Sequence, residues 1–198
     1  MPTRQLWNES SMQLTSRSKF LFLIGVFMVP VVAAYFAYFG WRPAGHTNYG
    51  ELLKVAPLQS TAGKTLDAHP FDLEALQGKW VMVHVGSANC DAACQQQLYL
   101  MRQVRITQGK EQSRIERLWV VSDSGTPDAV LLRAHPGLVV WRPADAVFVT
   151  QFPAVRERDE HIYLVDPLGN LMLRFPAQPD AKRMMKDLKL LLKASQIG

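Results

Sequence analysis

Cysteine is nearly missing from this chain: its 198 residues contain two, Cys90 and Cys94. A small domain held together by several disulfides is therefore excluded. The sequence also lacks a glycine-rich phosphate loop, a Ser/His/Asp constellation and a zinc-ligand cluster, so hydrolase and nucleotide-dependent functions have no support. A haem-attachment pair is excluded because Gln95 stands where a histidine would be needed. Internal repeats and low-complexity tracts are lacking too, which excludes a solenoid or a long disordered tail.

A concentration of charge of one sign is also missing from most of the chain. The net charge is +5, but residues 1–42 carry four basic residues and one acidic residue, while residues 43–198 carry eighteen and sixteen. The larger part is therefore close to balance and has no basic run of five or more. We expect no nucleic-acid partner.

The chain does contain one long apolar run, FLFLIGVFMVPVVAAYFAYF, at residues 20–39. It carries no charge, and its twenty residues match the thickness of a bilayer in a helical conformation. It exceeds the roughly 7–15 apolar residues of a signal peptide and ends in an aromatic cluster typical of a membrane interface. The run predicts an uncleaved transmembrane anchor over residues 20–41, with a long signal peptide as the alternative.

The charges beside this run predict its orientation. Arg4, Arg17 and Lys19 stand before it against Glu9, whereas Arg42 alone follows at once. By the positive-inside rule, the N-terminus lies in the cytoplasm and the remainder lies outside, which in a bacterium is the oxidising periplasm. We therefore predict a single-pass protein of the bacterial inner membrane, with a cytoplasmic segment (1–19), an anchor (20–41), a tether (42–57) and a globular domain (58–198).

The exported part alternates between strand and helix patterns. Two nearly continuous apolar runs predict strands buried on both faces, and DPLGN joins two further apolar strands in a hairpin. Asn89 or Asp91 is expected to cap the first helix and Thr126 the second. In chain order the predicted elements are a strand at 79–86, helix at about 92–106, strand at 117–123, helix at 126–135, hairpin at 161–176 and helix at 180–195, with a less certain strand within 138–152. This order predicts an α/β fold, a thioredoxin-like central sheet flanked by helices.

The two cysteines fall where the first core strand leads into the first helix. A helix N-terminus stabilises thiolate, the form that attacks disulfides and binds metals. Three residues separate Cys90 from Cys94, which is wider than the usual dithiol motif and less natural for a disulfide; this spacing suits a soft ion such as copper(I) held between two sulfurs. Asp91 between them opposes thiolate formation. The structural alternative, a staple or two buried thiols, is weaker because so short a loop stabilises little.

A nitrogen ligand would complete a copper(II) site, and the chain has five histidines. His161 stands at the mouth of a predicted strand, close to where thioredoxin-like folds carry a cis-proline facing the cysteines. His84 lies inside a buried strand and is expected to be a satisfied core residue. The charged neighbours of His161 allow a second interpretation, a solvated surface histidine.

The sequences KWVMVHVGSANCDAAC, RLWVVSDSGTPDAV and HIYLVDPLGNLMLRF resemble the Sco/SenC family, membrane-tethered thioredoxin-like copper proteins of cytochrome c oxidase assembly. The resemblance covers about residues 58–195. It implies that Cys90 and Cys94 bind copper, Cu(I) or Cu(II), with His161 as third ligand. The implied role is copper delivery to, or thiol maintenance of, the copper-bearing subunit of the oxidase. Two positions depart from the family pattern: Asp91 replaces a proline, and His161 stands two residues before Tyr163 instead of five.

Three functional hypotheses follow. The first is a copper chaperone or assembly factor for the oxidase copper centre. The second is a TlpA-like thiol-disulfide oxidoreductase, in which one cysteine attacks a client disulfide and the other resolves the intermediate. The third is a tethered interaction module without active thiols. The lack of a proline at the cis-proline position counts against the second.

Overall fold

The structure is a computed structural model that describes residues 15–40 and 48–195. The chain divides into two compact units, residues 1–46 and 47–198. In the first unit, helix α1 (Ser16–Gly40) has no buried residue, and by length and composition it can cross a membrane. Its 25 residues extend about 37 Å at the rise of an α-helix. Helix α1 starts four residues before the predicted anchor, and residue 41 lies outside the described residues.

The second unit is built on one mixed sheet. Within the described residues the sheet has eight strands, in the order β1-β8-β7-β4-β5-β6-β2-β3. The strands β4, β5 and β6 run parallel, and all other pairs are antiparallel. The strands are β1 (Glu51–Pro57), β2 (Gly63–Thr65), β3 (Pro70–Phe71), β4 (Trp80–Gly86), β5 (Ile115–Val121), β6 (Leu138–Pro143), β7 (Ile162–Val165) and β8 (Asn170–Arg174).

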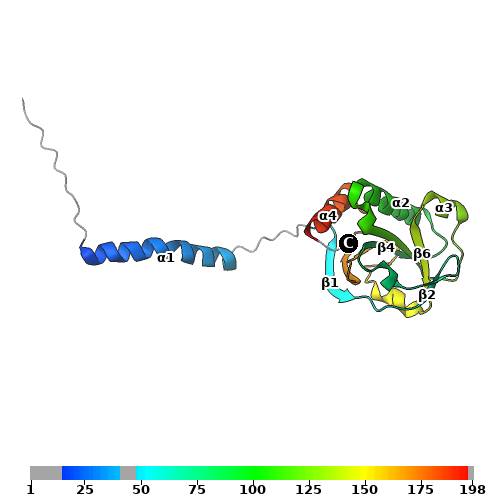
Figure 1. Cartoon of the computed structure of the whole chain (residues 1–198), viewed down its shortest axis with the longest axis horizontal. Helices are drawn as coiled ribbons and strands as arrows, with labels where there is room; N and C mark the ends of the chain where they lie inside the picture. The colour runs from blue at the N-terminus through cyan, green and yellow to red at the C-terminus, as the bar shows by residue number, and fades with distance from the viewer. Residues whose placement is uncertain (1–14, 41–47, 196–198) are drawn as a thin grey trace, which may run out of the picture. The chain divides into compact units, whose positions relative to one another are not determined.

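The central strands are buried on both faces, as their apolar runs predict. All seven residues of β4 are buried, and its side chains alternate between the two faces. Met82 belongs to the hydrophobic cluster under α2 (Ala92–Thr107) and α4 (Ala181–Ala194), which lie side by side on that face (Figure 1). Val83 belongs to the cluster on the opposite face, to which the short helices η1 (Leu73–Leu76) and η3 (Ala146–Gln151) contribute. Two short helices, η2 (Gly109–Arg114) and α3 (Ala129–Ala134), complete the unit.

Aspartates begin the three α-helices of this unit. The Asp91 carboxylate accepts the Cys94 N–H at the start of α2, and Asp180 accepts the Arg183 N–H at the start of α4. For α3, Asp128 accepts the Val130 N–H, so the expectation of Thr126 as N-cap is wrong and this helix begins later. The physical reason is that a carboxylate two residues further on satisfies the free N–H of the first turn.

The hairpin of β7 and β8 is confirmed. The turn between these strands is closed by Asp166, whose Oδ1 accepts the N–H groups of Leu168 and Asn170. Gly169 has a φ of 86°, the left-handed region that glycine enters without a steric penalty. The order strand, helix, strand, helix, hairpin, helix therefore describes the centre of the fold.

The edges of the sheet differ from the prediction. Residues 51–57 were predicted as part of a tether, but they form β1, which pairs antiparallel with β8. The segment between β1 and β4 adds β2 and β3, which extend the other edge next to β6. These edge strands are short or exposed, so they have no apolar run by which periodicity could detect them.

Candidate functional site

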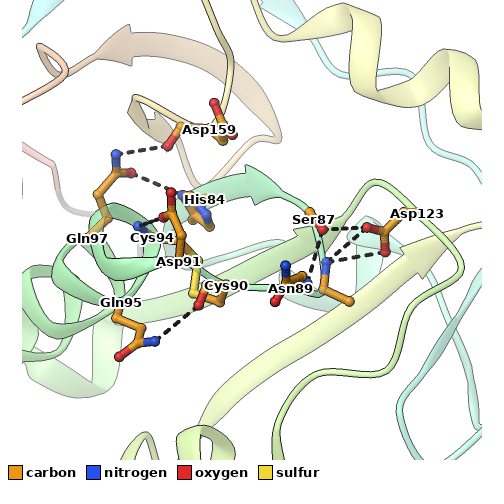
Figure 2. Close-up of a disulfide and its surroundings, with 11 residues drawn as sticks. His84, Ser87, Asn89, Cys90, Asp91, Cys94, Gln95, Gln97, Asp123 and Asp159 are labelled. Atoms are coloured by element: carbon orange, nitrogen blue, oxygen red, sulfur yellow. Dashed lines mark hydrogen bonds between the residues drawn. A yellow bond between two sulfur atoms is a disulfide. The ribbon is translucent and has the colours of Figure 1, made fainter.

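The two cysteines lie where β4 leads into α2, and they form a disulfide (Figure 2). Their Cα atoms are 5.2 Å apart, inside the usual range of about 4.4–6.8 Å. The expectation that a three-residue spacing is less natural for a disulfide is therefore wrong. The first turn of α2 curves the chain back enough to bring Cys94 to Cys90, which lies just before the helix. Cys90 is partly exposed, whereas Cys94 is only 7% exposed and belongs to the hydrophobic core.

The N-terminus of α2 fixes the position of this pair. Asp91 Oδ1 accepts the Cys94 N–H at 2.9 Å, which confirms one of the two expected caps. Gln95 Nε2 donates to the carbonyl of Cys90 at 3.1 Å, so the residue before the helix is tied to its first turn. The remaining N–H groups of this turn and the helix dipole favour a thiolate at the same place.

A carboxylate in the loop after β5 holds the loop that precedes Cys90. Asp123 accepts hydrogen bonds from Ser87 Oγ at 2.5 Å, from the Ala88 N–H at 3.2 Å and from the Gly125 N–H at 3.0 Å. These bonds, that of Ser87 first, lower the pKa of Asp123, while partial burial opposes the shift. The loops after β4 and β5 are thereby joined, and Cys90 is presented from a fixed backbone (Figure 2).

Cys90 lines an open groove of about 790 Å³ between the start of α2 and α3. The groove is polar and acidic on the side facing Cys90, where Asp123 and Asp128 contribute. Asn89 and Gln95 also line it. Cys90 therefore borders this groove, whereas Cys94 is buried and is not among the residues that line it.

A buried histidine lies on the same face of the sheet, on β4. His84 is fully buried, and its Nδ1 is 3.0 Å from Oε1 of Gln97 on α2. Gln97 Nε2 donates to the carbonyl of Asp159, so Gln97 presents an acceptor to the imidazole and Nδ1 carries the proton. Burial lowers the pKa of His84 to about 4, although the bond to Gln97 acts in the opposite direction. His84 is therefore neutral at physiological pH.

The other imidazole nitrogen of His84 has no partner among the described residues. Nε2 is buried and lacks a hydrogen bond within the part of the chain that the structure describes. A Cβ at Gly86 would approach Nε2 to 2.9 Å and the Cβ of Asp159 to 3.3 Å. A side chain at position 86 would have to displace these groups, so glycine is needed for the close approach of the loop at Asp159 to β4.

His161 lies at the start of β7, as predicted, but it is buried at 4% exposure. Its Nδ1 donates to the carbonyl of Phe175 at 2.8 Å, and its Nε2 has no partner among the described residues. It borders a pocket of about 370 Å³ with Tyr49, Glu160 and Arg174. Across residues 15–40 and 48–195, no three His, Cys, Asp or Glu side chains are grouped to hold a metal ion. The ligand set of Cys90, Cys94 and His161 therefore stays a prediction.

The two other histidines within the described residues lie apart from the disulfide region. His69 is exposed between β2 and β3, His135 is buried at the end of α3, and His46 lies outside the described residues. Sequence reasoning missed Gln97, Asp123 and Asp159 as neighbours of the site. One signal was available for His84: it is the single polar side chain within the buried run of β4. The other three become neighbours only through tertiary contacts.

Comparisons with known proteins find the same thioredoxin-like fold. The family model described as "transmembrane-like, thioredoxin-like, C-terminal domain" matches residues 80–195. A search of curated protein sequences found no match. Similar solved structures include yeast Sco1 with copper bound (18% identity, TM-score 0.60, covering 72% of this chain and 96% of that chain) and apo Sco1 from Thermus thermophilus (21%, 0.58, 75% and 99%). The thioredoxin domain of a thiol-disulfide oxidoreductase from Bacteroides vulgatus is also similar (17%, 0.54, 71% and 99%).

These similarities concern the fold, since all three identities are low. They confirm the predicted fold class, and they confirm the resemblance to Sco/SenC proteins at the level of the fold. Structures with copper and a structure named for thiol-disulfide chemistry share this fold, so it is compatible with both chemistries.

Proposed function

Because the chain belongs to the transmembrane-like, thioredoxin-like family whose model it matches, we propose that it is a membrane-anchored dithiol protein of the bacterial inner membrane. The globular unit lies on the periplasmic side, and its Cys90–Cys94 pair keeps the cysteines of an extracytoplasmic client reduced. The client that the resemblance favours is the copper-bearing subunit of cytochrome c oxidase. One observation carries the proposal: the two sulfurs are bonded, and only Cys90 is presented to solvent.

The chemistry is thiol-disulfide exchange. In the reduced protein the Cys90 thiolate attacks one sulfur of a client disulfide, the client S–S bond breaks, and the client sulfur that leaves takes up a proton. The Cys94 thiolate then attacks the sulfur of Cys90, which restores the internal disulfide and releases the second client thiol. Two electrons pass to the client, and an external dithiol donor must reduce the pair again.

Three features of the site support these roles. Cys90 borders the groove and lies just before the N-terminus of α2, where a thiolate is favoured. Cys94 is buried, so it is shielded from clients but stays within reach of Cys90. Asp123 and Asp91 fix the backbone on either side, which keeps the two sulfurs at bonding separation without further rearrangement.

A test of this function uses the full chain in detergent and a peptide with one intramolecular disulfide. We expect the reduced wild type to reduce the peptide. Cys94→Ser should accumulate a mixed disulfide at Cys90, and Cys90→Ser, the matched variant, should form none. If wild-type protein leaves the peptide oxidised, or if the adduct forms on Cys94, the proposal fails.

A second function, copper(I) binding by the reduced pair, is favoured by the donor set. Two soft sulfur donors side by side select copper(I) among the available metals, and yeast Sco1 is a copper-bound protein of the same fold. In this function copper is the cargo that the protein delivers to the oxidase subunit. Cys90 and Cys94 would hold it, with His161 as the predicted nitrogen ligand of the copper(II) form.

Copper binding is tested by titrating the reduced full chain with copper(I) against a competing chelator. Tight one-to-one binding that is lost in Cys90→Ser, but kept in the surface variant Gln95→Ala, supports delivery. A protein that neither binds copper nor exchanges disulfides would be an interaction module that keeps the fold without the chemistry.

A further inference from the structure

The exposed face of α4 carries only positive charge. Its charged side chains that reach solvent are Lys182, Arg183, Lys186, Lys189 and Lys193, and all five are exposed. The single acidic residue within α4, Asp187, is buried at 3% exposure. Leu190 lies on the same outer face and is 45% exposed. The helix therefore presents a basic surface with one exposed apolar side chain within it, and a basic surface of this kind is attracted to an anionic membrane.

This surface, which we call the basic face of α4, accounts for the uneven distribution of charge over the globular unit. Of the eighteen basic and sixteen acidic residues after position 42, five basic and one acidic residue belong to α4. The rest of this part is consequently net acidic. Lys110, just after α2, lines a groove of about 420 Å³ together with Lys189, Lys193 and the ion pair of Glu111 and Arg114, and so extends the basic face. The groove at Cys90, in contrast, is lined by Asp123 and Asp128.

The residues at the start of the globular unit are hydrogen-bonded to α4. The N–H groups of Tyr49 and Gly50 both donate to Asp187 Oδ2 at 2.8 Å. The hydroxyl of Tyr49 accepts the Asp180 N–H at 2.9 Å, and the Arg183 guanidinium lies 4.1 Å from the centre of its ring. The point of attachment is therefore next to the basic face of α4.

The connection is also short. Seven residues, 41–47, separate the end of α1 from the first described residue of the globular unit, and seven residues span at most about 25 Å. A domain of this size has a radius of gyration of about 15 Å. If α1 is the membrane anchor proposed above, the connection is short compared with the width of the domain.

From these observations we infer that the basic face of α4 docks on the anionic phospholipids of the membrane that holds the anchor. Lysine and arginine are attracted to an anionic leaflet at short range, and salt screens the attraction. Leu190 is positioned to enter the headgroup region. Along α2, Thr107 lies thirteen residues, about 20 Å of helix, beyond Cys94, and no residue of α4 lines the groove at Cys90. Docking by this face leaves Cys90 and its acidic groove free for a client.

The inference rests on the proposed anchor and is tested with the full chain in lipid nanodiscs. One set of discs contains phosphatidylcholine alone, and the other contains about 30% phosphatidylglycerol as the anionic probe. Acetylation rates of individual lysines are measured by mass spectrometry. In anionic discs we expect Lys186, Lys189 and Lys193 to react at least about fivefold more slowly, and 0.5 M NaCl to remove the difference. Lys54 and Lys64, exposed on the strands β1 and β2, should react equally in both discs.

Variants that remove charge show whether the basic face of α4, and not the positive charge of the protein in general, causes the protection. Lys189→Gln with Lys193→Gln should abolish most of the protection at Lys186, while the matched control, Lys54→Gln with Lys64→Gln, should leave it intact. Equal acetylation in both discs, or protection that appears only with an added acidic protein or nucleic acid, overturns the docking. A separate experiment tests the anchor: membranes that contain the wild type are washed with alkaline carbonate, which releases proteins that do not span the bilayer. A chain that stays in the membrane without lysine protection refutes the docking alone, and a chain that is extracted refutes both.

Discussion

Two regions of the globular unit each contain a buried histidine with the same hydrogen-bonding state. In the first, at the β4–α2 junction, His84 uses Nδ1 to reach Gln97 and leaves Nε2 without a partner among the described residues. In the second, at the start of β7, His161 uses Nδ1 to reach the carbonyl of Phe175 and also leaves Nε2 unpaired. The partners differ: an amide on the helix that carries Cys94 in one case, and the backbone that follows β8 in the other.

The difference shows which histidine is hydrogen-bonded to the helix that carries Cys94. Cys94 and Gln97 lie three residues apart on α2, and both are buried on the side of the helix that faces the sheet. His84 is thus linked by one side-chain hydrogen bond to the helix that carries Cys94. His161, in contrast, borders the pocket beside Tyr49. Sequence position favoured His161 as the partner of the cysteines, whereas the hydrogen bonds connect His84 to their helix.

The largest expected effect is on the pH dependence of folding. The pKa of His84 is about 4 in the folded protein and about 6.5 when unfolded, so between these values the unfolded state binds the extra proton. The stability that neutral His84 contributes is complete above pH 6.5 and is lost as the pH falls towards 4, by about 3 kcal/mol in total. His84→Gln should remove most of this slope, as measured by urea unfolding at several pH values.

One further histidine adds to that slope. Burial also lowers the pKa of His135, so His135→Gln should remove a share of the pH dependence but leave that of His84 in place. If the slope between pH 4 and 6.5 is the same in wild type and His84→Gln, the buried neutral histidine is not the cause. The contrast between the two histidine regions would then lose its electrostatic basis.

The next effect concerns the link between His84 and α2. Gln97→Met leaves the Nδ1–H of His84 without an acceptor and the Asp159 carbonyl without a donor, and should lower the free energy of unfolding by about 2 kcal/mol. Gln95→Met on the exposed side of the same helix is the matched control and should cost less than about 0.5 kcal/mol. Equal losses in the two variants would show that the buried amide contributes no more than an exposed one.

A smaller effect tests His161 as a copper ligand. His161→Ala should leave the copper(I) affinity of the reduced protein within about threefold, because two sulfurs dominate that site, but should change the copper(II) absorption spectrum. The exposed His69→Ala is the control. An unchanged copper(II) spectrum would remove His161 from the ligand set. A spectrum that changes instead in His84→Ala would assign the nitrogen to the other region.

The smallest effect concerns Asp91. Asparagine caps a helix about as well as aspartate, so Asp91→Asn should leave stability unchanged while removing a negative charge between the two thiols. The reduced Cys90 should then be alkylated by iodoacetamide about twofold faster at neutral pH, since the loss of an exposed charge favours thiolate only slightly. Asp180→Asn, at the cap of α4, is the control. A slower reaction in Asp91→Asn would mean that the carboxylate assists the thiol.

Much of the fold could be predicted because its centre has strong patterns. The apolar runs of β4 and β5 and the turn at Asp166 are local signals, and so is the amphipathic helix α4. The edge strand β1 was assigned to a tether because its residues are mostly exposed and one face meets solvent. The spacing of the cysteines was interpreted as less natural for a disulfide, but Cys90 precedes α2, and the first turn of the helix brings Cys94 to it.

Only the cysteine pair of the candidate site could be predicted from the sequence. Cys90 and Cys94 are recognisable by type and position, since each signal lies within a few residues. The neighbours Gln97, Asp123 and Asp159 come from three separate segments, and their contacts depend on how α2 and two loops pack on β4. Whether a histidine in a buried strand has one or two partners is likewise decided by packing, which periodicity does not contain.

The bonds of Tyr49 and Gly50 to Asp187 also have a mechanical consequence. Tension along the connecting segment reaches these bonds before it reaches β1, whose ladder with β8 is irregular. Because Asp187 sits in the middle of α4, the load passes into a helix packed against α2 and the sheet instead of peeling the edge strand residue by residue. If α1 anchors the domain as proposed, α4 therefore carries a pulling force on the connecting segment and the edge of the sheet stays paired.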